Sequence, residues 1–240
     1  MSEMLVLTGF TRPEDIRYDG VENFARHTVR ELIIHPNRYD VALMKLNAPI
    51  TYTDVASPIC LPNPHQLIPG DVRAVATGFG RNDANVYGGT GRLREVTVPI
   101  IPAEECEAAH PWRSESSKTW KNEFICASTL TAGAYSVVKC HETHFVIPFF
   151  QGDSGGPLHM RASDGRWFQI GIASFSGKGA DFGVKPVVFV NAKKYCDWIK
   201  DNTGGEAGCQ EEEVILENDT NKKENEPEEV TEASKVNNWS

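Results

Sequence analysis

Short runs of alternating apolar and polar residues, bounded by glycine, proline, asparagine and aspartate, dominate the first 190 residues of the chain. Such runs are typical of β-strands that bury one face. They predict strands over residues 28–34, 41–46, 72–77, 91–98, 167–175 and 186–190. Because no unit recurs with the period of a solenoid or propeller, the pattern predicts an all-β body without internal repeats.

One segment near the end of this body has a helical pattern instead. Asn191 can cap a helix, and Tyr195, Trp198 and Ile199 supply an apolar face at helical spacing. The pair Gly204-Gly205 can end it. The sequence therefore predicts one C-terminal helix after the β-strands.

Charge divides the 240-residue chain unevenly. Residues 211–240 hold ten acidic and three basic residues, a net charge of −7, out of −9 for the whole chain. Few apolar side chains are available there to offset the entropy of ordering, so we expect a folded domain over 1–204 and a disordered acidic tail over 205–240. The nearly neutral body lacks the basic face that nucleic acid requires, and no apolar run is long enough for a membrane span. Neither partner is expected.

Six cysteines occur, none in a Cys-x-x-Cys pair, and the seven histidines lack metal-ligand spacing. No metal or other cofactor is therefore expected. The first residues, Met1-Ser-Glu-Met-Leu-Val-Leu, have no basic region before the apolar patch, so the sequence as given shows no secretory signal.

The chemistry concentrates at Gln151-Gly-Asp-Ser-Gly-Gly-Pro-Leu158. Glycines around Ser154 let a substrate approach closely, and the tight backbone can aim the amides of Gly152 and Ser154 at one point, as an oxyanion hole requires. The run resembles the nucleophile motif of trypsin/chymotrypsin-like serine proteases, peptidase family S1. Two earlier stretches match in order: residues 35–46 resemble the segment with the triad aspartate, and residues 57–62 resemble the linker before the second barrel.

Further stretches match the same family. Thr77-Gly-Phe-Gly80 corresponds to its Gly-Trp-Gly turn, Cys106 and Cys126 to one of its disulfides, and residues 195–199 to its C-terminal helix. The resemblance covers most of residues 4–204. It implies two antiparallel β-barrels with the active site between them, the first barrel truncated here, followed by the helix and the tail.

The resemblance also implies roles for single residues. Ser154 corresponds to the nucleophile, the Gly152 amide to an oxyanion donor, and Asp40 to the carboxylate that orients the histidine base. The family histidine lies in a segment upstream of the part that this sequence matches. Of the histidines before Asp40, His27 and His35 have no such context. We therefore expect the chain as given to be inactive.

Asp153 corresponds to the structural aspartate that pairs with the new amino terminus of activated family members. That terminus has no counterpart in this sequence. An unpaired carboxylate is costly to bury, so we expect Asp153 to turn toward solvent. A first barrel that lacks strands should likewise expose unpaired edges.

Ser174, Phe175 and Ser176 correspond to the strand that pairs with the substrate, and Val187 lies where the family borders its specificity pocket. Residues 136–150 have no family counterpart, and a true loop insertion and a gene-model artefact both remain open. Pro148 stands where trypsin-like enzymes carry an aspartate, so cleavage after lysine or arginine is unsupported, and small apolar residues are favoured.

Two disulfides common in the family have each lost both cysteines. Ala74 and Met160 occupy one pair of positions, and Phe150 occupies one half of the other. Such paired loss is typical of a folded relative. The pairing of Cys60, Cys140, Cys196 and Cys209 stays open, since four cysteines allow three connectivities.

Two hypotheses follow from the resemblance. The chain is part of a serine endopeptidase that acts on a protein or peptide substrate, or it is a non-catalytic homologue that binds proteins. Family resemblance implies an extracellular, monomeric protein in either case.

Overall fold

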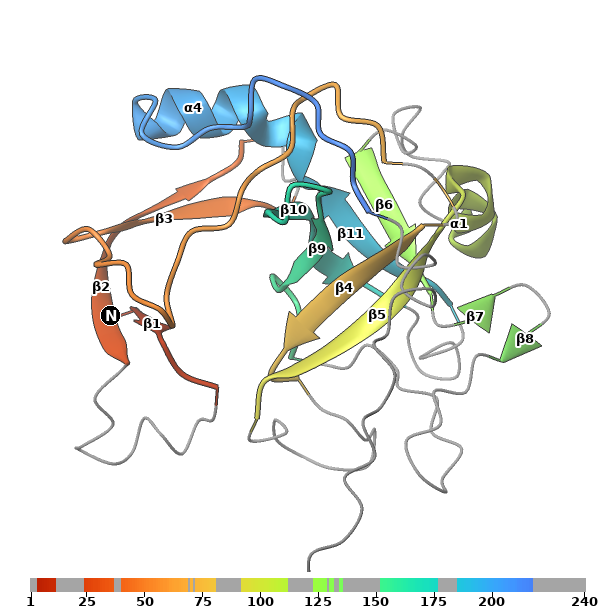
Figure 1. The fold of residues 1–240 in the computed structure, drawn as a ribbon, viewed down its shortest axis with the longest axis horizontal. Helices are drawn as coiled ribbons and strands as arrows, with labels where there is room; N and C mark the ends of the chain where they lie inside the picture. Colours follow the sequence, from red (N-terminus) through yellow and green to blue (C-terminus); the bar gives the residue numbers. More distant parts are fainter. Residues whose placement is uncertain are drawn as a thin grey trace, which may run out of the picture.

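The first part of the chain forms a small open sheet. The computed structural model describes residues 4–11, 24–36, 40–68, 70, 72–80, 92–111, 123–128, 130–131, 134–135, 152–176 and 185–217. Strands β1 (Leu5–Thr8), β2 (Ala25–Ile34) and β3 (Ala42–Leu46) pair antiparallel in that order (Figure 1). Within the described residues, no further strand pairs with the outer edges of β1 and β3.

One face of this sheet is apolar and partly uncovered. Leu32 lies opposite Met44 in the β2–β3 register, and the two side chains are 44% and 52% exposed. The neighbouring Ile34 is 67% exposed. An apolar face of this kind normally lies inside a barrel, as the first barrel implied by the family resemblance would require.

The second part of the chain forms a closed six-stranded barrel in the order β10-β11-β6-β5-β4-β9 (Figure 1). Its strands are β4 (Arg73–Gly78), β5 (Arg94–Ile101), β6 (Phe124–Ala127), β9 (Pro157–Arg161), β10 (Trp167–Phe175) and β11 (Val187–Asn191). The core is filled by side chains that alternate along these strands, among them Leu158 and Met160 from β9 and Phe168 and Ile170 from β10, each at most 1% exposed. This barrel confirms the predicted all-β fold.

Two short strands stand apart from the barrel. They are β7 (Leu130–Thr131) and β8 (Ala134–Tyr135), which pair antiparallel. The segment over 136–150, where the sequence departs from the family pattern, lies outside the described residues.

The predicted C-terminal helix is present as a 3₁₀ turn, η3 (Ala192–Tyr195), that continues into α4 (Cys196–Thr203). Gly204 ends it with φ 64°, a left-handed conformation that glycine adopts at little cost. Tyr195 and Ile199 pack with Val41 before β3 and Val190 of β11, so the helix joins the open sheet to the barrel.

The described residues also contain a helix that the sequence analysis did not predict, α1 (Ala103–Ala109). It follows Pro102, whose fixed φ suits the start of a helix. Of the described helices, none is long and apolar enough to cross a membrane.

Residues 205–217, which the sequence analysis assigned to the disordered tail, form a C-terminal strap that packs on the body. Val214 and Leu216 pack against the barrel core. Gln66 brackets Val214, because its Nε2 donates to the Val214 carbonyl at 3.0 Å and the Val214 amide donates to its Oε1 at 2.8 Å. These partly buried aliphatic side chains help to offset the entropy of ordering the acidic run.

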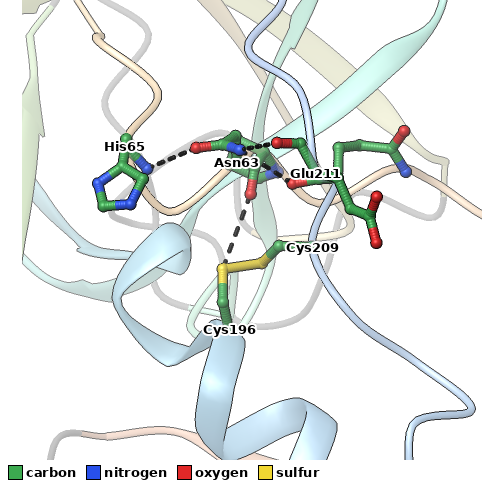
Figure 2. The surroundings of a disulfide bond; sticks show 7 residues. Asn63, His65, Cys196, Cys209 and Glu211 are labelled. Atoms are coloured by element: carbon green, nitrogen blue, oxygen red, sulfur yellow. Dashed lines mark hydrogen bonds between the residues drawn. A yellow bond between two sulfur atoms is a disulfide. The ribbon is translucent and has the colours of Figure 1, made fainter.

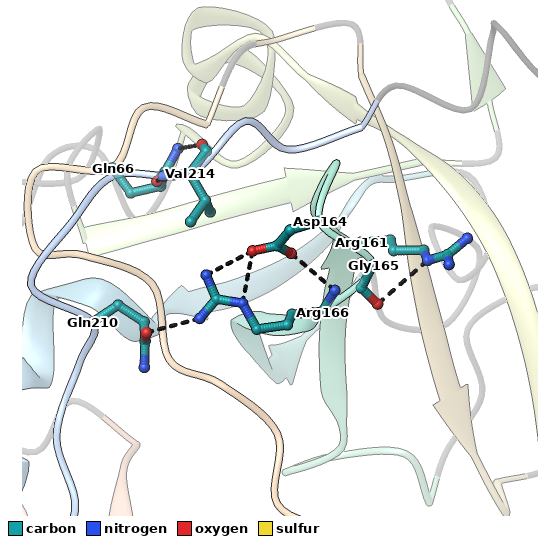
Figure 3. Close-up of polar contacts among 7 residues, drawn as sticks. All are labelled: Gln66, Arg161, Asp164, Gly165, Arg166, Gln210 and Val214. Atoms are coloured by element: carbon teal, nitrogen blue, oxygen red, sulfur yellow. Dashed lines mark hydrogen bonds and ion pairs between the residues drawn. The ribbon is translucent and has the colours of Figure 1, made fainter.

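The strap also contacts the turn between β9 and β10, as Figure 3 shows. The Arg166 guanidinium donates to the Gln210 side chain at 2.9 Å and forms an ion pair with Asp164 at 2.7 Å. Further along, the Glu217 amide donates to the Arg161 carbonyl at 2.8 Å. Residues 218–240 of the predicted tail lie outside the described residues.

The described residues contain two disulfides. Cys106–Cys126 links α1 to β6, as the family resemblance implies. Cys196–Cys209 ties the strap to helix α4 and settles a pairing that the sequence left open (Figure 2). Asn63 supports this second disulfide region, because its side-chain amide donates to the carbonyls of Gln210 and Glu211. Cys60 is not part of a disulfide, and Cys140 lies outside the described residues.

Candidate active site

The predicted nucleophile lies on a glycine-rich turn that leads into β9. Gly152 and Gly155 have φ values of 113° and 82°, which only glycine adopts without strain. Between them Ser154 is exposed. The turn is fixed to β10 by two hydrogen bonds: the Gly155 amide donates to the Ala173 carbonyl, and the Ala173 amide donates to the Gly156 carbonyl, both at 2.8 Å.

The predicted orienting carboxylate lies beside the same strand. Ser174 Oγ donates a hydrogen bond of 2.7 Å to Asp40 Oδ2, across a sequence separation of 134 residues. Asp40 itself has φ 59°, so it occupies a left-handed conformation two residues before β3 begins. Because Ala173 holds the turn of Ser154 and its neighbour Ser174 holds Asp40, strand β10 brings the two predicted residues to one place.

Asp153 does not turn toward solvent as the sequence analysis expected. Its side chain is half-buried, and the Gly80 amide donates to its Oδ1 at 2.7 Å. The carboxylate fills the space beside the turn of Gly78 and Gly80, where an added Cβ would come within 1.9 Å and 2.4 Å of its atoms. A hydrogen-bond donor from the turn reduces the cost of burying the charge.

Comparison with known proteins follows the same residues. Residues 17–199 match the family model described as Trypsin. The chain belongs to the trypsin family. It is 35% identical over 179 residues to the serine proteinase stubble of Drosophila melanogaster, an overlap that covers 71% of this chain and 20% of that protein. The chain thus spans about a fifth of the length of that curated relative.

The residues predicted to border the substrate in this trypsin-family chain lie on two adjacent strands. Ser174 and Phe175 end β10, and Ser176 follows it. Val187 begins β11, which pairs with β10 so that Phe175 lies opposite Val188. The structure therefore brings these residues together, while Pro148 lies outside the described residues.

The two histidines upstream of Asp40 have partners elsewhere in the trypsin-family fold. His27 Nε2 lies 3.0 Å from the Thr8 hydroxyl in the open sheet. The His35 ring makes edge contacts with Tyr195 and Trp198, with centroids 5.2 Å and 4.9 Å away. These contacts belong to the packing of the sheet and of helix α4.

The sequence analysis missed one residue near the substrate strand. His110 follows α1 and is 1% exposed. Its Nε2 lies 3.0 Å from the Pro186 carbonyl, and its ring meets Phe175 edge to face. The sequence does show a histidine shortly after the cysteine of the predicted disulfide. Because α1 was not predicted, nothing in the sequence indicated that this ring lies against residues 175 and 186.

Proposed function

We propose that the chain carries the nucleophile part of a serine endopeptidase that acts on peptide bonds of protein substrates. Ser154 attacks the carbonyl carbon, the amides of Gly152 and Ser154 stabilise the oxyanion, and Asp40 orients a histidine base. The observation that carries this proposal is the pair of β10 contacts, one to the nucleophile turn and one to Asp40. Ser174 donates to one carboxylate oxygen, and the other is the acceptor that an imidazole N–H needs.

We further propose that neither His27 nor His35 is the base. Both imidazoles have the contacts described above, and none of those three partners belongs to the proposed site. Without a base, Ser154 has no acceptor for its proton. Catalysis then falls to the roughly 10³–10⁴-fold over water that oxyanion stabilisation and binding provide. Residues 1–240 alone should therefore show no measurable peptidase activity.

A fluorophosphonate probe tests both parts of the proposal. We expect slow labelling of residues 1–240, faster labelling when imidazole is added to the buffer, and none in Ser154→Ala. Rapid labelling without imidazole would contradict the missing base. Imidazole-dependent labelling that persists in Ser154→Ala would contradict the assignment of the nucleophile.

The substrate site supports a preference for small apolar residues at the position before the cleaved bond. Val187 lies at the start of β11, beside the predicted substrate strand, and is partly buried against the barrel core. A branched side chain there narrows the space for a substrate side chain. We also propose an extracellular, monomeric protein, since two disulfides are typical of oxidising compartments.

A second candidate function is a non-catalytic homologue that binds a protein in the same cleft. It is favoured by the way this chain has replaced a common family disulfide with well-buried residues. Ala74 and Met160 are each 1% exposed and belong to the barrel core. If this function holds, Ser154→Ala retains full affinity for the bound protein, and imidazole produces no labelling of Ser154.

A further inference from the structure

A cavity of about 200 Å³ lies where helix α1 meets the barrel. Its walls come from the segment before β4, the junction of β5 with α1, strand β6 and the turn η3. Figure 1 shows α1 beside β6 in this part of the molecule. The residues assigned above to catalysis and to the substrate do not line it. The cavity is therefore a separate candidate site, and its lining indicates what it can bind.

The floor of the cavity is apolar and fixed in shape. Ile100 of β5 and Ile125 of β6 line it and are 4% and 7% exposed. Beside them the Cys106–Cys126 disulfide joins α1 to β6. Close-packed and cross-linked walls of this kind keep a cavity formed without a ligand. An apolar cavity of about 150 Å³ holds benzene, so this one has room for a slightly larger apolar group.

The mouth of the cavity is positively charged. Lys193 and Lys194 of η3 line it, and the Lys193 ammonium donates one hydrogen bond to the Gln66 carbonyl at 2.5 Å. An ammonium has three donors, so two remain for a ligand. Burial lowers the pKa of Lys193 and the charge of Lys194 adds to this effect, while Glu213 opposes it. Within the part of the chain that the structure describes, neither ammonium forms an ion pair. A carboxylate at the mouth would offset both the desolvation and the repulsion.

We propose that this cavity binds an aliphatic carboxylic acid of about eight carbons, with its chain on the floor of Ile100 and Ile125 and its carboxylate at Lys193 and Lys194. This site goes beyond the endopeptidase function and does not depend on it. The C-terminal strap should respond to the ligand, because Lys193 also bonds to Gln66, whose side chain holds the backbone of residue 214.

Four small molecules separate the two parts of this recognition. Octanoate carries the chain and the negative charge, octanol the chain alone, acetate the charge alone, and octylammonium the chain with the opposite charge. Isothermal titration of the 240-residue chain measures their affinities. We expect saturable binding of octanoate, about tenfold weaker binding of octanol, since hydrogen bonds to a charged group are lost, and no saturation by the other two. Equal affinities for octanoate and octanol, or no saturable binding of octanoate, would overturn the proposal.

A charge variant tests the mouth of the cavity. Lys194→Gln removes one ammonium and leaves the bond between Lys193 and Gln66 in place. It should weaken octanoate binding about tenfold and leave octanol binding unchanged. Lys200→Gln is the matched control, because Lys200 is exposed on α4 and does not line the cavity. The same octanoate affinity in both variants would contradict the assigned carboxylate position.

A second variant tests the cavity itself. An added Cβ at Gly70 would lie 3.7 Å from Pro102, an ordinary contact, so Gly70→Val fills the space without forcing the backbone to move. It should abolish binding of both octanoate and octanol, whereas Gly208→Val, with open space around its Cβ, should change neither. Urea unfolding of both variants establishes that they are folded. Octanoate binding that persists in folded Gly70→Val refutes this location, and if that variant does not fold, Lys194→Gln decides.

Hydrogen exchange locates the bound ligand. Octanoate should slow exchange of the amides over 100–106 and 124–126 several-fold, and also over 213–216 through Gln66. Protection confined to the open sheet over 28–34 and 42–46, which also exposes apolar side chains, would place octanoate there and overturn the proposal. Ser154→Ala should bind octanoate as the wild type does, so a failure of the proposed endopeptidase function is distinguishable from a failure of this site.

Discussion

A disulfide placed between strands β4 and β9 should form and should stabilise the barrel. The two strands pair antiparallel with Val75 opposite His159, so the next position in the ladder sets Ala74 opposite Met160. Both side chains are 1% exposed and point into the core. Facing positions on paired strands lie within the Cα separation that a disulfide spans. The perturbation is the double variant Ala74→Cys/Met160→Cys.

The expected gain follows from the length of the closed loop and the volume that is lost. Cross-linking positions 74 and 160 removes about 4.5 kcal/mol of chain entropy from the unfolded state in the loop-closure model. Replacing the buried Met160 by the smaller cysteine costs about 2 kcal/mol in lost contacts and residual cavity. The net gain is about 2.5 kcal/mol, which raises the urea midpoint by about 1 M.

Free-thiol titration and non-reducing mass analysis establish whether the bond forms, and urea unfolding gives its effect. Ala74→Ser/Met160→Ser is the matched control, because it makes similar volume changes without a cross-link. We expect the cysteine variant to have the same thiol count as the wild type and a higher midpoint than the control. A folded variant with two additional free thiols would refute the inferred register of these positions.

Three further variants test the site and its surroundings. Gly80→Ala places a Cβ within 2.4 Å of the Asp153 carboxylate, so it should lower the free energy of unfolding by about 1–3 kcal/mol and abolish probe labelling of Ser154. Gly208→Ala is the control, because nothing lies within 4 Å of its Cβ, and it should change neither quantity. Burial lowers the pKa of His159, and Glu95 partly opposes this effect. The neutral imidazole therefore makes its full contribution to stability above about pH 6.5, and that contribution is lost as the pH falls below this value. In His159→Gln, the urea midpoint should decrease less steeply toward acid pH. Cys209→Ser opens a link of 13 residues and should cost up to about 3 kcal/mol, with faster amide exchange confined to the strap; unchanged exchange there would contradict its dependence on the disulfide.

The strands with clear alternation could be predicted from the sequence because their period records which face is buried. All six predicted strands are present, with ends that differ by a few residues. Strand β9 was missed, although Leu158 and Met160 alternate with His159 and Arg161. Its signal was overlooked because the glycine-rich motif before it reads as a turn.

The contacts that assemble the site could not be predicted from local patterns. The bond between Ser174 and Asp40 joins residues 134 positions apart, and Gln66 meets Val214 across 148 positions. Family resemblance assigned Asp40 and Ser174 to the active site but predicted neither of these two contacts. The packing of the strap does not follow from its composition: three consecutive glutamates dominate that composition, while two partly buried aliphatic side chains contact the barrel core.

The backbone at Asp40 limits how its carboxylate can be examined by mutagenesis. With φ at 59°, alanine there would add about 1–2 kcal/mol of conformational strain, so its phenotype would mix charge removal with distortion of the segment entering β3. Asparagine tolerates this geometry far better than other non-glycine residues. Asp40→Asn is therefore the substitution that reports on electrostatics alone. Glycine would remove the strain but would increase the conformational freedom of the backbone at this position.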